Sequence, residues 1–207
     1  MTSLAFEFST DRRTIAIARD GLLLAQSLLE RVRETPLAAL VDRVLSESGL
    51  QPREIDRLVV GLGPGSYTGV RLAISLAQGW HLGLRTEVVG LSSLEALAAA
   101  SEHLEGRTLL AVDAQRGEYA VARAESGRLM EPPRLCCLDD IKAQMGLGLR
   151  VAGPDLGLAL PGVVALHPEA TWLAVMADQC APTAPERLAP VYLREAAFVK
   201  APAPRSL

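Results

Sequence analysis

The chain has 207 residues, 49% of them hydrophobic, and a formal net charge of −3. This length allows one domain or two small ones, and the apolar content favours a compact globule over disorder. Because no cluster of Lys and Arg stands out, the composition disfavours a chain that binds nucleic acid by itself.

The first half of the chain predicts an alternation of strands and helices. Strands are expected over residues 4–8, 14–18 and 22–28, with a hairpin turn at Asp20-Gly21. A single apolar stripe after Pro36 predicts a helix that ends at Gly49. This half continues with a strand over 58–60, a helix over 70–82 and a strand over 85–91. It ends with a helix that begins at a Ser92/Glu95 capping box and runs to residue 102.

The second half repeats this order. Strands are expected over residues 109–114, 118–124 and 149–151, a further short strand after the Ser126-Gly127 turn, and helices over 139–145 and 168–179. The run Ala5-Phe6-Glu7 aligns with Ala111-Val112-Asp113, which indicates an internal repeat. We expect an α/β fold made of two β-β-β-α-β-α units, as in actin-like proteins, sugar kinases and Hsp70. The expected domains are residues 1–106 and 107–207, with an irregular, proline-rich tail from about 181.

A glycine-rich loop lies between the strand over 58–60 and the helix that follows it. Its free N–H groups suit an anion, and Ser66 or Thr68 is placed to cap the helix. The loop lacks the Gly-Lys-Ser/Thr ending of a P-loop and the flanking glycines of a nucleophile elbow. Two interpretations stay open: a phosphate contact, and a sharp structural corner.

Two acidic residues stand at the ends of the first strands of the two halves. Glu7 and Asp113 fit either weak nucleotide contact across a cleft or the capping of strand ends. The candidate nucleotide- or anion-binding residues are Gly63, Gly65, Ser66, Thr68, Glu7 and Asp113.

The helix over residues 70–82 is apolar on nearly all sides, whereas a helix on one sheet at a water surface needs a single apolar stripe. Its second face combines apolar side chains with a ridge of small residues, which lets another helix approach closely. We expect a partner interface there; the alternative is that the helix after Pro36 or the second domain covers this face. The predicted interface residues are Leu72, Ser75, Leu76, Gly79, Trp80 and Gly83.

No metal centre is expected. His81, His103 and His167 have no histidine four residues away and no nearby Cys/His set. The adjacent Cys136 and Cys137 suit neither a disulfide nor a zinc site. Without a membrane-spanning run or a secretory leader pattern, we expect a cytoplasmic protein with reduced thiols.

The run LGPGSYTGVR at residues 62–71, followed by GLSSLEALA at 90–98, closely resembles the TsaB family. The VDA run at 112–114 with Arg116, Glu118 and Tyr119, and PVYLR at 190–194, match later motifs of that family. Two departures stand out. Glu7-Phe8-Ser9-Thr10 replaces the usual Asp-Thr-Ser type of first-strand ending, and Val32-Arg33-Glu34 replaces the His-Ser-Glu that often precedes the first helix.

The resemblance implies a non-catalytic subunit in the synthesis of threonylcarbamoyladenosine on the tRNA adenosine next to the anticodon. Its catalytic paralogue, TsaD, holds a metal through two histidines four residues apart, and this chain has Ser93 and Leu97 at the matching places. The implied partners are a TsaD-like catalytic subunit, a TsaE-like ATPase, tRNA only through the complex, and a second copy when the chain is alone. No cofactor is implied beyond weak nucleotide binding.

Two other functions compete with this one. An actin-like ATPase or kinase acting alone would need tight ATP binding, and a metalloprotease would need an H-x-x-x-H or H-E-x-x-H motif, which does not occur.

Overall fold

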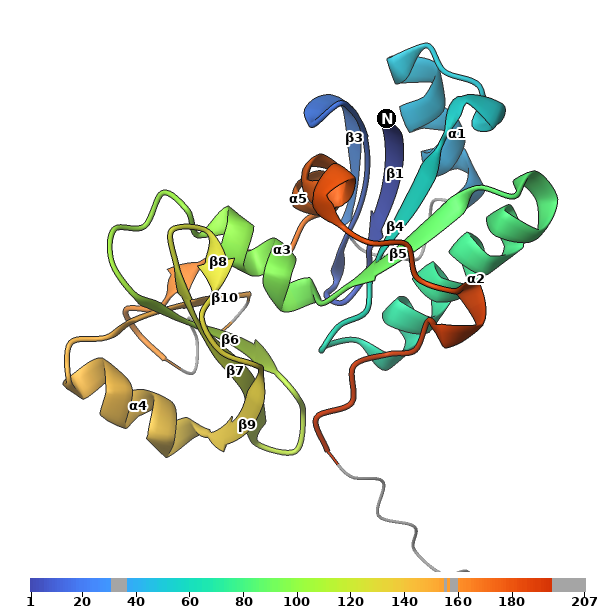
Figure 1. Ribbon diagram of the computed structural model, residues 1–207. Coiled ribbons are helices and arrows are strands. Elements are labelled where there is room, and N and C mark those ends of the chain that lie inside the picture. The colour runs from blue at the N-terminus through green and yellow to red at the C-terminus, as the bar shows by residue number, and fades with distance from the viewer. Residues whose placement is uncertain (31–36, 155, 157–159, 195–207) are drawn as a thin grey trace, which may run out of the picture.

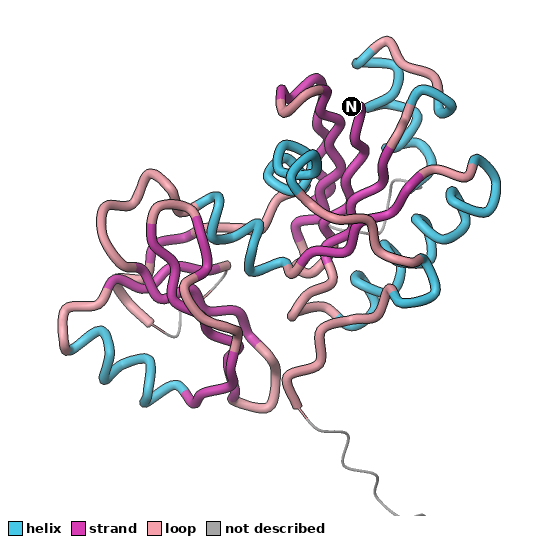
Figure 2. The backbone as a smooth tube through the Cα atoms, in the orientation of Figure 1, coloured by secondary structure: helices cyan, strands magenta, loops and turns pink. Residues whose placement is uncertain are grey.

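The computed structural model describes residues 1–30, 37–154, 156 and 160–194. They form two separate sheets, seen as two groups of strands in Figure 2. The strands of the first sheet lie in the order β3-β2-β1-β4-β5; β1 is antiparallel to β2 and parallel to β4. Their bounds are β1 Thr2–Glu7, β2 Arg12–Arg19, β3 Leu22–Glu30, β4 Arg57–Gly61 and β5 Glu87–Leu91.

The two faces of this sheet are packed differently, because side chains alternate along each strand. Large residues such as Leu4, Phe6 and Ile17 face helices α1, Leu37–Ser48, and α2, Tyr67–Leu84. Small residues, among them Ala5 and Ala16, face helix α5, Ala170–Met176. The alanines let α5 lie close to the sheet.

The second sheet has the order β11-β10-β6-β7-β8, and β9 pairs with β7. Helix α4, Leu138–Gly146, covers one face and helix α3, Ser93–Ala100, packs on the other. In both sheets the central strand, β1 or β6, pairs antiparallel with the next strand along the chain. The expected duplicated, actin-like α/β fold is confirmed. The strand bounds are β6 Thr108–Asp113, β7 Glu118–Glu125, β8 Arg128–Leu129, β9 Arg134–Cys137, β10 Arg150–Gly153 and β11 Val164–Ala165.

The two halves exchange helices. α3 follows the first sheet in the chain but buries Leu94 and Leu97 against the second, and Figure 1 shows it between the two. α5 follows the second sheet but packs on the first, where Ala170 N donates to Thr14 Oγ1 at 2.7 Å. Arg57 Nη1 on β4 donates to the carbonyls of Ala177 and Cys180 just beyond α5. The division at residue 106 separates the two sheets, and the assignment of residues 1–106 and 107–207 as two domains stays a prediction.

The glycine-rich loop between β4 and α2 lies directly on the end of β1. A Cβ built at Gly61 would lie 1.9 Å from Glu7 Oε2, and one at Gly69 would lie 2.0 Å from the carbonyl oxygen of Phe8. A Cβ at Gly65 would meet Ser9 O at 2.2 Å. The corner therefore requires glycine for close backbone approach. Ser66 caps the helix as predicted, since its side chain accepts from Gly69 N.

A buried hydrogen-bond network fixes the same loop to α3. Glu7 is fully buried; its Oε1 accepts from Ser9 N and its Oε2 accepts from Ser93 Oγ, both at 2.7 Å. Ser93 Oγ in turn accepts from Gly63 N at 3.0 Å, and Gly63 O accepts from Ser93 N at 2.8 Å. These bonds hold the carboxyl end of β1, the loop and the first turn of α3 as one unit, and they satisfy both oxygens of the buried Glu7.

Substitution of Gly69 tests the close approach. Gly69→Ala forces its Cβ against a backbone carbonyl that cannot move aside, and we expect a loss of about 1–3 kcal/mol in the free energy of unfolding. Gly79→Ala, in the same helix, is the matched control: its Cβ would meet no heavy atom within 4 Å, and alanine favours a helix by up to about 1 kcal/mol. Urea unfolding of both variants measures this; equal effects would contradict the steric account.

Titration tests the burial of Glu7. Burial raises the pKa of Glu7, and the hydrogen bonds from Ser9 and Ser93 oppose that shift. Because the folded state holds this proton more tightly than the unfolded chain, where the glutamate pKa is about 4.3, the contribution to stability is full below that pH. It is lost as the pH rises through the raised pKa.

Glu7→Gln removes this titration while keeping the shape of the side chain. We expect the free energy of unfolding of the variant, relative to the wild type, to increase from about pH 5 to about pH 8. Urea unfolding across this range measures the difference, and a constant difference would show that Glu7 does not titrate differently in the folded state.

Candidate functional site

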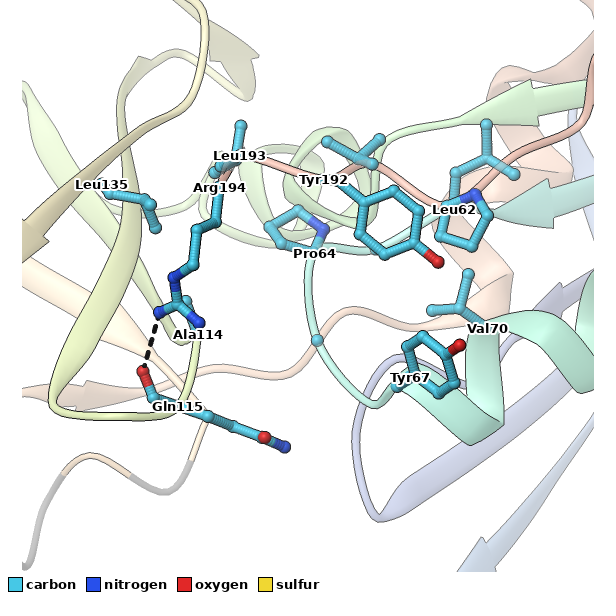
Figure 3. Close-up of a pocket in the computed structure, with 14 residues that line it drawn as sticks. Leu62, Pro64, Tyr67, Val70, Ala114, Gln115, Leu135, Tyr192, Leu193 and Arg194 are labelled. Atoms are coloured by element: carbon cyan, nitrogen blue, oxygen red, sulfur yellow. Dashed lines mark hydrogen bonds between the residues drawn. The ribbon is translucent and has the colours of Figure 1, made fainter. Parts of the chain in front are cut away.

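A pocket of about 190 Å³ lies between the two halves, beside the glycine-rich loop. Pro64, Tyr67 and Tyr192 border it on the side of the first sheet, and Ala114, Leu135 and Arg194 border it on the other (Figure 3). The walls are mainly apolar, with tyrosine and arginine groups at the rim, so the pocket suits a small, largely apolar group with a polar end.

The tail forms one wall of this pocket as a strap that crosses from one half to the other. Val191 N donates to Leu62 O at 2.8 Å, and Arg71 Nη2 donates to the hydroxyl of Tyr192 at 3.0 Å. At the other half, Arg194 pairs with Glu118, its Nε donating to Oε2 at 3.0 Å, and its Nη2 reaches Gln115 O (Figure 3). The irregular tail therefore holds the two halves across the pocket.

Arg71 links the loop helix to this strap. Its guanidinium lies 4.0 Å from the centroid of the Tyr67 ring, and the hydrogen bond to Tyr192 raises the pKa of Arg71. From the sequence, Glu118 and the PVYLR run at residues 190–194 were identified only as motif residues, without a role. Their contact joins residues 76 positions apart, and no local pattern reports it.

The predicted nucleotide- or anion-binding residues do not come together at one place. Gly63 and Gly65 line the pocket, but Ser66 caps α2 and Thr68 is exposed. Glu7 is buried behind the loop, and Asp113 accepts a hydrogen bond from Gln115 N at 2.6 Å. Both carboxylates thus complete local structure, and nucleotide binding stays a prediction.

The positions that match the metal-binding histidines of TsaD are occupied by structural contacts. Ser93 is bonded to Glu7, and Leu97 is fully buried against the second sheet. The part of the chain that the structure describes contains no group of three or more His, Cys, Asp or Glu residues able to hold a metal ion. His81 lies in the last turn of α2, where Nδ1 is 2.8 Å from Thr86 O.

The predicted partner face of α2 is an exposed apolar groove. Leu72, Leu76 and Trp80 are half-buried against the core of the first sheet, and with Ser75 and Gly79 they line a shallow hollow of about 350 Å³. A Cβ at Gly79 or Gly83 would meet nothing within 4 Å. No described segment of the chain covers this hollow, so the face is available to another molecule.

None of the described helices combines the length and the apolarity that crossing a membrane requires.

Known proteins resemble this chain in sequence and in structure. Residues 30–150 match the family model of TsaD, described as tRNA N6-adenosine threonylcarbamoyltransferase. The chain is 36% identical over 121 residues to the tRNA threonylcarbamoyladenosine biosynthesis protein TsaB of Escherichia coli (strain K12), a match that covers 57% of this chain and 52% of the relative. The aligned part thus spans about half the length of the curated TsaB relatives.

Two further relatives match nearly the whole chain: one is a protein without a named activity, and the other is a solved structure. An uncharacterized protein of Mycobacterium tuberculosis is 31% identical over 203 residues, which cover 93% of this chain and 92% of the relative. The structure of YeaZ from Pseudomonas aeruginosa superposes with a TM-score of 0.76 at 25% identity, and covers 93% of this chain and 99% of that one. The family model and the TsaB relatives agree with the motifs at residues 62–71 and 90–98, and this chain belongs to the TsaB family.

Proposed function

We propose that this chain takes part in the biosynthesis of threonylcarbamoyladenosine in tRNA as a supporting subunit. In this proposal it binds a TsaD-like catalytic subunit and performs no chemistry itself. The groove on α2 carries the proposal, because it is an apolar, glycine-notched surface that the described monomer leaves open.

The shape of the groove suits a partner helix. Leu72, Leu76 and Trp80 supply apolar area and an aromatic anchor, the kind of residue that dominates binding energy at interfaces. The two glycines, one turn apart, let the backbone of a second helix approach more closely than any larger residue would.

The contacts of Ser93 and Leu97 favour a supporting role over catalysis. A catalytic TsaD-like chain would need metal ligands at these two positions, but here one side chain holds Glu7 and the other fills a core. Neither can reach a metal ion without breaking the packing that joins the halves. The mechanism is therefore one of binding: the chain holds its partner in a competent arrangement.

The charge of the chain is consistent with tRNA contact only through the complex. A net charge of −3 gives little attraction to a phosphate backbone, so the catalytic subunit would supply most of it. A TsaE-like ATPase would complete the assembly, and the same α2 surface would pair two copies of this chain when the catalytic subunit is absent.

A bulky residue in the groove tests the proposal. A Cβ at Gly79 meets no heavy atom within 4 Å, so we expect Gly79→Trp to fill the notch, to fold normally and to lose co-purification with the TsaD-like subunit from the same organism. The loss should be at least about a hundredfold in affinity, because one side chain blocks the centre of the contact. Co-expression followed by gel filtration measures it.

The matched control is Gly146→Trp, at the end of α4, where a Cβ also meets nothing within 4 Å. This variant should bind like the wild type. A complex retained by Gly79→Trp, or a wild-type chain that never binds the catalytic subunit, would overturn the proposal.

A further inference from the structure

The outer side of β3 is a long sheet edge without a partner. β3 pairs with β2 from Leu22 to Glu30, apart from the bulged Leu24, and no described strand pairs with its other side (Figure 1). An unpaired edge presents backbone N–H and C=O groups that can bond to another strand.

The other sheet edges are covered or short. At β5, the edge is bonded by the tail: Thr183 N donates to Val88 O at 2.7 Å, and Gly90 N donates to Thr183 Oγ1 at 3.1 Å. In the second sheet, β8 and β11 have two residues each and β9 has four. A covered edge and a short edge strand both prevent edge-to-edge association, and β3 has neither; the feature that blunts its edge is the β-bulge at Leu24.

The side chains of β3 are unusually apolar for an exposed edge. Leu22 is 72% exposed, and Leu23, Leu24 and Leu28 are each 40–42% exposed. No charged residue occurs from residue 22 to residue 29, so charges that would protect the edge are absent from all of the strand except its last residue, Glu30. Leu24 is the extra residue at a β-bulge and has no partner on β2. No described part of the chain buries these leucines further, and a second molecule could.

We propose that β3 pairs with β3 of a second copy of this chain, antiparallel about a two-fold axis at Gln26. This arrangement places Leu24 opposite the second copy's Leu28, Gln26 opposite its own counterpart, and Leu22 opposite Glu30. It brings no like charges together, and it joins two five-stranded sheets into one. The pattern is self-complementary about Gln26. A two-fold contact requires such a pattern, whereas pairing with a strand of another protein does not.

This surface is separate from the groove on α2. α2 packs on β4 and β1, on the sheet face that carries Leu4 and Phe6, whereas Gln26 is bonded to Thr171 of α5 on the opposite face. One chain can therefore use both surfaces at once, so the dimer through β3 goes beyond the proposed function and does not depend on it.

Sedimentation of the full chain tests the dimer. The experiment uses Gly79→Trp as the background, which removes pairing through α2, over loading concentrations from about 1 to 100 μM. We expect this background to dimerise. We expect the added change Leu28→Lys to weaken dimerisation about tenfold or more, because a two-fold dimer contains the substituted residue in both strands of the contact. The matched control is Leu147→Lys, which changes a leucine that is 83% exposed beyond α4 and should have no effect.

Cross-linking tests the register. Residues opposite each other in an antiparallel pair have Cα atoms about 4.5–5.5 Å apart, which a disulfide can bridge. In a Cys137→Ser background, Gln26→Cys should form a covalent dimer with diamide, and Gln51→Cys, another exposed glutamine, should not. Circular dichroism checks that each variant is folded.

A Gly79→Trp chain that stays monomeric over this range would overturn the proposal. So would a dimer that folded Leu28→Lys leaves unchanged and that Gln26→Cys fails to cross-link.

Discussion

The structure depends on the contact between the carboxyl end of β1 and the glycine-rich loop. Carbonyl oxygens of Phe8 and Ser9 and the carboxyl group of Glu7 occupy the space where Gly69, Gly65 and Gly61 would otherwise carry side chains. The loop can lie there only because glycine has no Cβ, and Glu7 can stay buried only because Ser9 and Ser93 satisfy its oxygens. Steric and polar requirements thus meet at one point, from which α2 and α3 both begin.

The consequences of that contact reach the second half of the molecule. Because Ser93 is held by Glu7 and Gly63, the direction of α3 is set as it enters the core of the second sheet. α5 returns to the first sheet, and the strap through Arg194 closes the pocket on the other side. The strand-end acid Glu7 and the first turn of α3 together hold this part of the architecture.

Local patterns predicted most of the elements. Apolar periodicity predicted α1, α2 and the strands of the first sheet, and the Ser92/Glu95 capping box and the Ser66 cap are present as expected. The glycine loop was left between two interpretations, because a corner and an anion site need the same residue types. The sequence could not predict that Glu7 is buried against Ser93, 86 positions away, nor the exchange of α3 and α5. Residues 22–28 were predicted to form a strand, but the exposure of its leucines depends on where α5 lies. The departure at Val32-Arg33-Glu34 lies outside the described residues.

The glycines of α2 fall into two kinds: one is required by the packing of the monomer, and two are not. Gly69 is required by the fold, since a larger residue would strike the backbone of β1. Gly79 and Gly83 meet no such obstacle, and each lowers the stability of the helix by about 0.8–1.0 kcal/mol relative to alanine. Nothing in the described monomer offsets that loss, because both positions face open space beside Leu76 and Trp80. In the proposed complex, a helix seated on the notch would bury the apolar side chains that the glycines leave accessible. The small residues of α2 thus serve no packing need of the described monomer, and they fit the close helix approach that the proposed complex requires.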